Sequence, residues 1–125
     1  MDQPFTFSHE RLVAFHVAAA LVAQAAEMRA GFPRGEGALA DQLTRAADSA
    51  LLNLCEGAAR RAGREKARFF DIARGSVVEC AAILTAVTIR RLAPPATTHE
   101  TRRIVCRLSG LLSGLARSAR ARGSA

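Results

Sequence analysis

The sequence predicts an all-α protein, an antiparallel up-and-down four-helix bundle forming a single domain over residues 1–125. Half of the residues are hydrophobic and 27 are alanine, whereas only 4 are proline, a composition typical of helical proteins. Four segments carry apolar residues at alternating steps of three and four, and no segment alternates with period two. The short breaks between them favour antiparallel neighbours. We expect helices over residues 8–30, 38–60, 64–92 and 98–120.

The first expected helix carries an apolar stripe along one face. Ser8 is placed to cap its start, with Phe7 and Leu12 as a hydrophobic staple. Gly31 and Pro33 are expected to end it. Its predicted core positions are Leu12, Phe15, Ala19, Val22 and Ala26.

The second expected helix has two unusual residues on its apolar face. Asn53 stands where an aliphatic residue is expected, and a buried amide must be paired. Gly57 costs a helix about 1 kcal/mol relative to alanine, which indicates a close backbone approach or a nearby helix end. Glu56 precedes Arg60 by one turn, the favourable order for an ion pair. The full stripe is Leu39, Leu43, Ala46, Ala50, Asn53 and Gly57.

The third expected helix begins after a break at Ala62 and Gly63. Pro94 and Pro95 separate it from the fourth. On the third helix, Gly75, Ser76 and Glu79 form a polar patch that suggests an interhelical contact. Thr97 and Glu100 are placed as a capping box for the fourth. The stripes are Phe69, Ala73, Ser76, Cys80, Ile83 and Val87, then Ile104, Leu108, Leu111 and Leu115.

Apolar residues left outside these stripes favour self-association, with a thick monomer core as the alternative. They are Leu51, Leu54, Phe70, Val77 and Leu84.

A motif in the middle of the chain resembles that of a known family. It consists of the run R-A-A-D-S-A-L-L-N-L-C-E-G at residues 45–57, then Arg60, Arg61 and Phe69, and the G-S-x-x-E of residues 75–79. This family is the bacterial four-helix-bundle family named for proteins encoded in intervening sequences of 23S ribosomal RNA genes. The resemblance covers residues 12 to 115. It implies an antiparallel four-helix bundle that often assembles as a ring of five protomers, and it implies no catalytic residue. A related bundle, the accessory variability protein of diversity-generating retroelements, forms a basic pentameric ring that partners a reverse transcriptase and RNA.

The polar residues of this motif are expected to form a network between the second and third helices or across a subunit boundary. Its role would be fold and register instead of chemistry. The predicted members are Arg45, Asn53, Glu56, Gly57, Gly75, Ser76 and Glu79.

The second half of the chain is basic and favours a polyanionic partner. Residues 1–59 hold 4 Arg against 7 acids, whereas residues 60–125 hold 13 Arg and 1 Lys against 4 acids. Trp and Tyr are absent, so we expect nucleic-acid binding to be electrostatic. The candidate residues are Arg60, Arg61, Arg64, Lys66 and Arg68, extended by Arg102, Arg103, Arg107, Arg117, Arg120 and Arg122.

The expected partners are RNA, DNA or a nucleic-acid enzyme, besides further copies of this chain. Two alternatives remain open at this point. The cationic residues can form a solvated surface that has no partner. Alternatively, the protein can be a structural adaptor that binds a protein without nucleic acid.

Enzymatic chemistry finds no support in the sequence. No histidine follows a glutamate by three residues, so a di-metal bundle site, any other metal site and a cofactor are not expected. His16 is interpreted as a core or interface residue, and Cys55, Cys80 and Cys106 as core side chains in a reducing cytoplasm. The most apolar stretch, residues 13–26, is interrupted by His16 and Gln24, so no membrane span is expected.

Overall fold

The computed structural model describes residues 6–61 and 63–123, and it confirms the all-α four-helix bundle. No strand occurs in these two ranges. The elements are a short 3-10 helix, η1 (Ser8–Arg11), followed by α1 (Val13–Gly31), α2 (Gly37–Ala59), α3 (Gly63–Arg90) and α4 (Pro95–Gly123).

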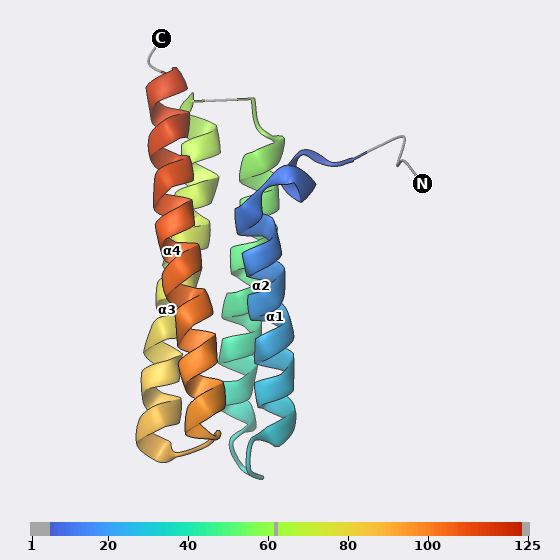
Figure 1. Ribbon diagram of the computed structural model, residues 1–125, viewed down its shortest axis with the longest axis vertical. Coiled ribbons are helices and arrows are strands. Elements are labelled where there is room, and N and C mark those ends of the chain that lie inside the picture. Colours follow the sequence, from blue (N-terminus) through green and yellow to red (C-terminus); the bar gives the residue numbers. More distant parts are fainter. Residues whose placement is uncertain (1–5, 62, 124–125) are drawn as a thin grey trace.

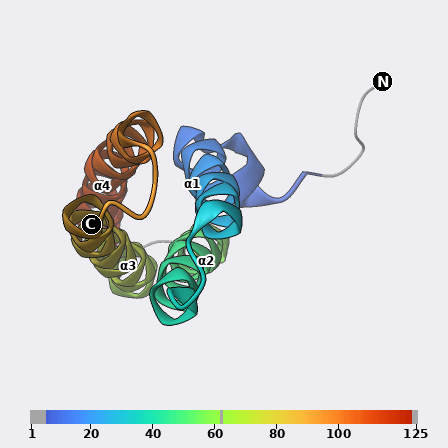
Figure 2. The same cartoon turned by 90° about the horizontal axis from the view of Figure 1, so that it is seen from below.

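The helices run alternately up and down the bundle (Figure 1). Viewed along its long axis, they follow one another around the core in chain order (Figure 2). α3 packs extensively against both α2 and α4, whereas α1 and α4 make less contact with each other. The α1–α2 and α3–α4 turns lie at one end of the bundle. The α2–α3 turn, the C-terminal end of α4 and η1 lie at the other (Figure 1).

Two predicted helix starts are wrong. Ser8 begins the separate helix η1, whereas α1 starts at Val13 after the extended Leu12, with no side-chain cap. α4 starts at Pro95, one turn before the position that a capping box at Thr97 requires. Proline suits this first helical position because its fixed φ is already helical and no N–H is needed there. The predicted ends at Gly31 and the opening of α3 at Gly63 are confirmed.

The predicted core face of α1 is correct only in part. Leu12, Phe15 and Val22 are partly buried and pack against the core, whereas Ala26 is exposed. α1 is apolar on almost all sides, so the periodicity of its sequence does not select one face. The buried residues are Ala14, Val17, Ala18, Leu21, Ala25 and Met28.

The other three helices bury a wider stripe than the one predicted. Four residues expected to remain outside the core are fully or almost fully buried: Leu54, Phe70, Val77 and Leu84. Leu51 is half-buried. A globular helix buries three to four residues per two turns, more than the narrow seam used for the prediction. Much of the predicted seam is nevertheless correct, namely Leu43, Ala46, Ala50, Gly57, Ala73, Cys80, Ile83, Val87 and Leu108.

Exposed apolar side chains lie on the outer face of α3 instead, and also at Phe7 and Val13. Val78 is 54% exposed and Ile89 is 76% exposed, with Ile72 and, on α2, Leu52 also accessible. An 18-residue window of α3 has a mean hydropathy of 1.6, yet only 33% of it is buried in the chain. By length and composition α3 could cross a membrane, but core helices of soluble proteins pass the same test, so this is weak support for a span.

The cysteines divide into three environments. Cys80 is fully buried, as predicted, and burial raises the pKa of its thiol to about 12. Cys55 is half-buried, and burial raises its pKa too. Cys106 is exposed on α4, so its assignment to the core is wrong.

Candidate functional site

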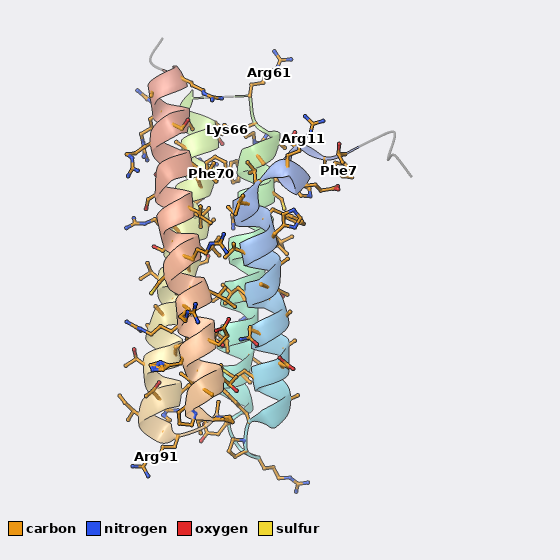
Figure 3. All side chains as sticks on the ribbon, viewed as in Figure 1. Phe7, Arg11, Arg61, Lys66, Phe70 and Arg91 are labelled. Atoms are coloured by element: carbon orange, nitrogen blue, oxygen red, sulfur yellow. The ribbon has the colours of Figure 1, made fainter. Side chains whose placement is uncertain are left out.

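One end of the bundle gathers most of the predicted cationic residues. This happens because the α2–α3 turn, the C-terminal end of α4 and η1 meet there. Arg61 and Lys66 are two of these cationic residues (Figure 3). Within the described residues, nine cations face four acids. We call this surface the basic end; its cations are Arg11, Arg60, Arg61, Arg64, Lys66, Arg68, Arg117, Arg120 and Arg122, and its acids are Glu10, Glu56, Glu65 and Asp71.

Each of the four acids of the basic end is already engaged. Glu56 pairs with Arg60 at 3.1 Å, the contact predicted one turn apart, and Asp71 pairs with Arg120 across α3 and α4. The third pair joins Glu65 to Arg68 at 2.8 Å, and its hydrogen bond lowers the pKa of the Glu65 carboxyl. The fourth acid, Glu10, accepts a hydrogen bond from the backbone N–H of Phe7 at 3.3 Å.

Lys66 has a structural role in the chain. Its Nζ donates to three carbonyl oxygens at the C-terminal end of α2, those of Gly57 at 3.0 Å, Ala58 at 3.2 Å and Arg60 at 2.9 Å. The last carbonyls of a helix lack intrahelical donors and carry partial negative charge, so an ammonium group there stabilises the helix end. Burial lowers the pKa of Lys66, and the charge of Arg122 lowers it further. All three ammonium donors are therefore used within the protein.

Arg60 and Arg68 also have partners in the chain. Their guanidinium carbons each lie 4.8 Å from the ring centroid of Phe69, in addition to their ion pairs. Such cation–π contacts hold the two side chains against the protein surface. Arg61 and Arg64, by contrast, are exposed and form no ion pair with any described residue. Of the five candidate cations, these two are the most accessible to a partner.

The predicted polar network forms only in part. Asn53 Nδ2 donates to the backbone oxygen of Ser49 at 2.9 Å and to its Oγ at 3.1 Å. Ser49 Oγ lies 2.8 Å from Ser76 Oγ and so links α2 to α3. Sequence reasoning missed Ser49, although its position four residues before Asn53 on the same helical face was a usable signal.

The remaining predicted members of the network do not join it within the chain. Glu56, Arg45 and Glu79 are exposed, and no bond of Arg45 or Glu79 to another described side chain is found. Gly75 faces open space, so within this patch the predicted interhelical contact is made by Ser76 and not by Gly75. These residues lie on the outer surface of the bundle because the wider core stripe turns them away from the α2–α3 contact.

Gly57 does mark the close approach that its position predicts. A Cβ at this residue would lie 2.8 Å from Cδ1 and Cε1 of Phe70 and 3.2 Å from Cβ of Phe69. Real Cβ atoms essentially never come within 3.0 Å of another heavy atom, so the two contacts with Phe70 could not form unless the packing shifted. A glycine is therefore required for α2 to pack on the start of α3.

His16 does not lie in the core. It is exposed, and its Nε2 is 3.0 Å from the backbone oxygen of Glu10, while its ring packs edge-on against Phe15. Among the residues that the structure describes, no group of three or more His, Cys, Asp or Glu side chains is arranged to hold a metal ion.

The 23S rRNA-intervening sequence protein family matches residues 10–114 of this chain. This span includes the α2 motif, the Asn53–Ser49–Ser76 contact and the α2–α3 turn. The chain belongs to that family. The family match stops before Arg117, Arg120 and Arg122, so these three cations of the basic end lie outside it. No curated protein matches the chain.

Proposed function

We propose that this family member is a non-enzymatic protein that binds the phosphate backbone of RNA or DNA, or a ribonucleoprotein, through its basic end. The observation that carries the proposal is the imbalance of nine cations against four acids that are all engaged. The exposed arginines left over are Arg11, Arg61, Arg64, Arg117 and Arg122. Arginine suits this role because its planar guanidinium group donates two parallel hydrogen bonds to a phosphate.

Base recognition at this surface has little support. Phe69 is covered by two arginines, and the chain has no Trp or Tyr to stack on unpaired bases. Backbone contacts position a nucleic acid without reading its sequence. We therefore expect low sequence specificity and a steep dependence of affinity on salt.

Assembly of several copies would multiply this charge. The exposed Val78 and Ile89 on α3 support a homo-oligomer through that helix face, which we take to be a pentamer from the family resemblance. Five copies would raise the formal charge from +7 to +35 and repeat the basic end around one rim. Sedimentation equilibrium at micromolar concentration tests this directly, because a mass of 13.3 kDa would exclude assembly. Val78→Asp with Ile89→Asp should dissociate the oligomer while leaving its helical circular dichroism intact.

The decisive experiment for nucleic-acid binding reverses the two accessible cations. Arg61→Glu with Arg64→Glu leaves the Arg60 and Arg68 ion pairs in place. Its matched control is Arg34→Glu with Arg91→Glu, because Arg91 lies at the other end (Figure 3) and Arg34 lies in the α1–α2 turn at that same end. Each phosphate contact contributes about −0.9 to the slope of log affinity against log salt on duplex DNA. Fluorescence anisotropy across salt concentrations measures this slope. Compared with wild type, the slope should be shallower by about 2 per engaged protomer for the basic-end variant and unchanged for the control. Identical curves for this variant and wild type would exclude the site.

A second function, a protein adaptor, is favoured by the apolar outer face of α3. An adaptor needs that face but not the charge surplus. Absence of nucleic-acid binding by wild type even at low salt would favour it.

A further inference from the structure

A cavity of about 500 Å3 opens at the basic end, between η1 and the adjoining ends of α2, α3 and α4. Its apolar wall includes the buried Phe70 and the half-buried Leu115. Its polar wall is formed by three cations and by hydroxyl groups that include Ser8 and Ser118. The volume lies in the range of about 300–1,000 Å3 that is common for small-ligand sites.

The charge of this cavity has a single sign. Its cations are Arg11 from η1, Lys66 from α3 and Arg122 from α4, and no described lining residue is acidic. Burial is the larger cause of the lowered pKa of Lys66, and the nearby charge of Arg122 lowers that pKa further, so the two cations lie near each other. Like charges held together without a counter-ion favour binding of an anion.

The three cations differ in what they can offer such an anion. The Lys66 ammonium donates to three backbone carbonyls, so it contributes charge but has no donor left. Arg11 and Arg122 are exposed and form no ion pair with the described residues, so their guanidinium groups can donate to a ligand. The hydroxyl groups of Ser8 and Ser118 are further donors.

We propose that this cavity binds a terminal phosphate monoester. The buried Phe70 lines the cavity, so the cavity reaches inwards as far as the packed core. A chain end or a small molecule fits such a recess better than the middle of a continuous strand does. A phosphate monoester carries about −1.5 to −2 charges at pH 7 and three acceptor oxygens, more than an internal phosphodiester. The monoester can come from the end of a nucleic-acid strand or from a free nucleotide. The strand source rests on the proposed nucleic-acid function, whereas the nucleotide source does not.

The first test compares three forms of one short single-stranded RNA, with a 5′-phosphate, a 3′-phosphate or hydroxyls at both ends. At physiological salt, wild type should bind at least one phosphorylated form about tenfold more tightly than the hydroxyl form, because charge-assisted hydrogen bonds to the extra oxygens are made only there. Competition by AMP, with adenosine as its control, distinguishes the sources. If AMP displaces the phosphorylated strand at a concentration similar to that of the unlabelled strand needed for the same displacement, the site binds a nucleotide. If AMP competes only weakly, the site binds a strand end.

Two variants locate the preference. Arg11→Gln with Arg122→Gln should remove the preference for phosphorylated ends. Arg61→Gln with Arg64→Gln should weaken the binding of all three strands but leave that preference unchanged. Circular dichroism checks that both remain folded. An unchanged preference in the first variant would overturn the inference.

The outcomes also separate this inference from the proposed function. Equal binding of all strands without competition by AMP overturns the cavity site and leaves backbone binding standing. No strand binding, with AMP raising the melting temperature of wild type but not of the Arg11 and Arg122 variant, supports the cavity site and removes the nucleic-acid function. No response to strands or to AMP overturns both.

Discussion

The two ends of the bundle use their charges differently. At the end formed by the α1–α2 and α3–α4 turns, which we call the paired end, ion pairs join different parts of the fold. Arg29 of α1 pairs with Asp41 of α2 at 2.5 Å, and Arg90 of α3 pairs with Glu36 at 3.7 Å. At the basic end, two of the three ion pairs lie within one helix or its C-terminal turn. Charges at the paired end connect helices, whereas the basic end keeps a surplus that is available to a partner.

The cysteines give the largest expected effect and test whether the two ends unfold together. Cys106 is exposed, whereas Cys80 is fully buried in the core that both ends share. Labelling of Cys80 requires global unfolding, so it should be at least about a thousandfold slower than labelling of Cys106. Mass spectrometry after a maleimide pulse measures both rates, with Cys55 expected in between. Rapid labelling of Cys80 would show that one part of the bundle opens independently.

The same buried thiol makes stability depend on alkaline pH. The folded-state pKa of Cys80 is raised from 9.0 to about 12, so its contribution to stability is complete below pH 9 and is lost as pH rises towards 12. The loss is at most about 1.4 kcal/mol per pH unit. Urea unfolding of Cys80→Ala at several pH values should lack this component, whereas Cys106→Ala should keep it.

Gly57→Ala should damage the packing of the basic end. The added Cβ meets the Phe70 ring, which is itself buried, so we expect a loss of about 1–3 kcal/mol in the free energy of unfolding. Gly110→Ala is the matched control, because Gly110 lies inside α4 and faces open space. That control should gain up to about 1 kcal/mol from helix propensity. Equal stabilisation by both substitutions in thermal melts would contradict the close α2–α3 approach.

Lys66→Met and Arg90→Met together compare a charge that caps a helix with a charge in a surface ion pair. Lys66→Met leaves three carbonyl oxygens at the end of α2 without their donor, and we expect a loss of about 1–2 kcal/mol. Arg90→Met at the paired end breaks an exposed ion pair and should cost less than about 1 kcal/mol. Denaturant midpoints measure both. If Lys66→Met left stability unchanged, the three carbonyl contacts would not stabilise the fold, and the Lys66 ammonium group would be available as a direct nucleic-acid contact.

The smallest expected effect concerns the turn after α3. Arg91 has a φ of 55°, and the N–H groups of Arg91 and Leu92 donate to the carbonyls of Thr88 and Val87, the arrangement that usually places glycine at this position. Arg91→Gly should therefore stabilise the paired end by up to about 1 kcal/mol. Gly63→Ala, at a φ of 79° in the basic end, should have the opposite sign. Melting temperatures that moved in the same direction would contradict this assignment of backbone strain.

The sequence alone determined the four helices, most of their ends and the existence of a basic segment. These features depend on local properties, namely helical periodicity, glycine and proline at breaks, and runs of like charge. The Glu56–Arg60 pair was predictable for the same reason, since both residues lie on one helix. The polar motif was sufficient to indicate the family, which the match over residues 10–114 confirmed.

Only the tertiary structure decided which surfaces are buried and which cations remain accessible. An almost uniformly apolar α1 has no preferred face until α2 and α4 pack on it, so its core residues could not be read from periodicity. Arg120 reaches Asp71 over 49 positions of sequence, and Lys66 is held by carbonyls of the preceding helix. Sequence gives the charge of a side chain, but its availability depends on which groups the folded chain brings within hydrogen-bonding distance.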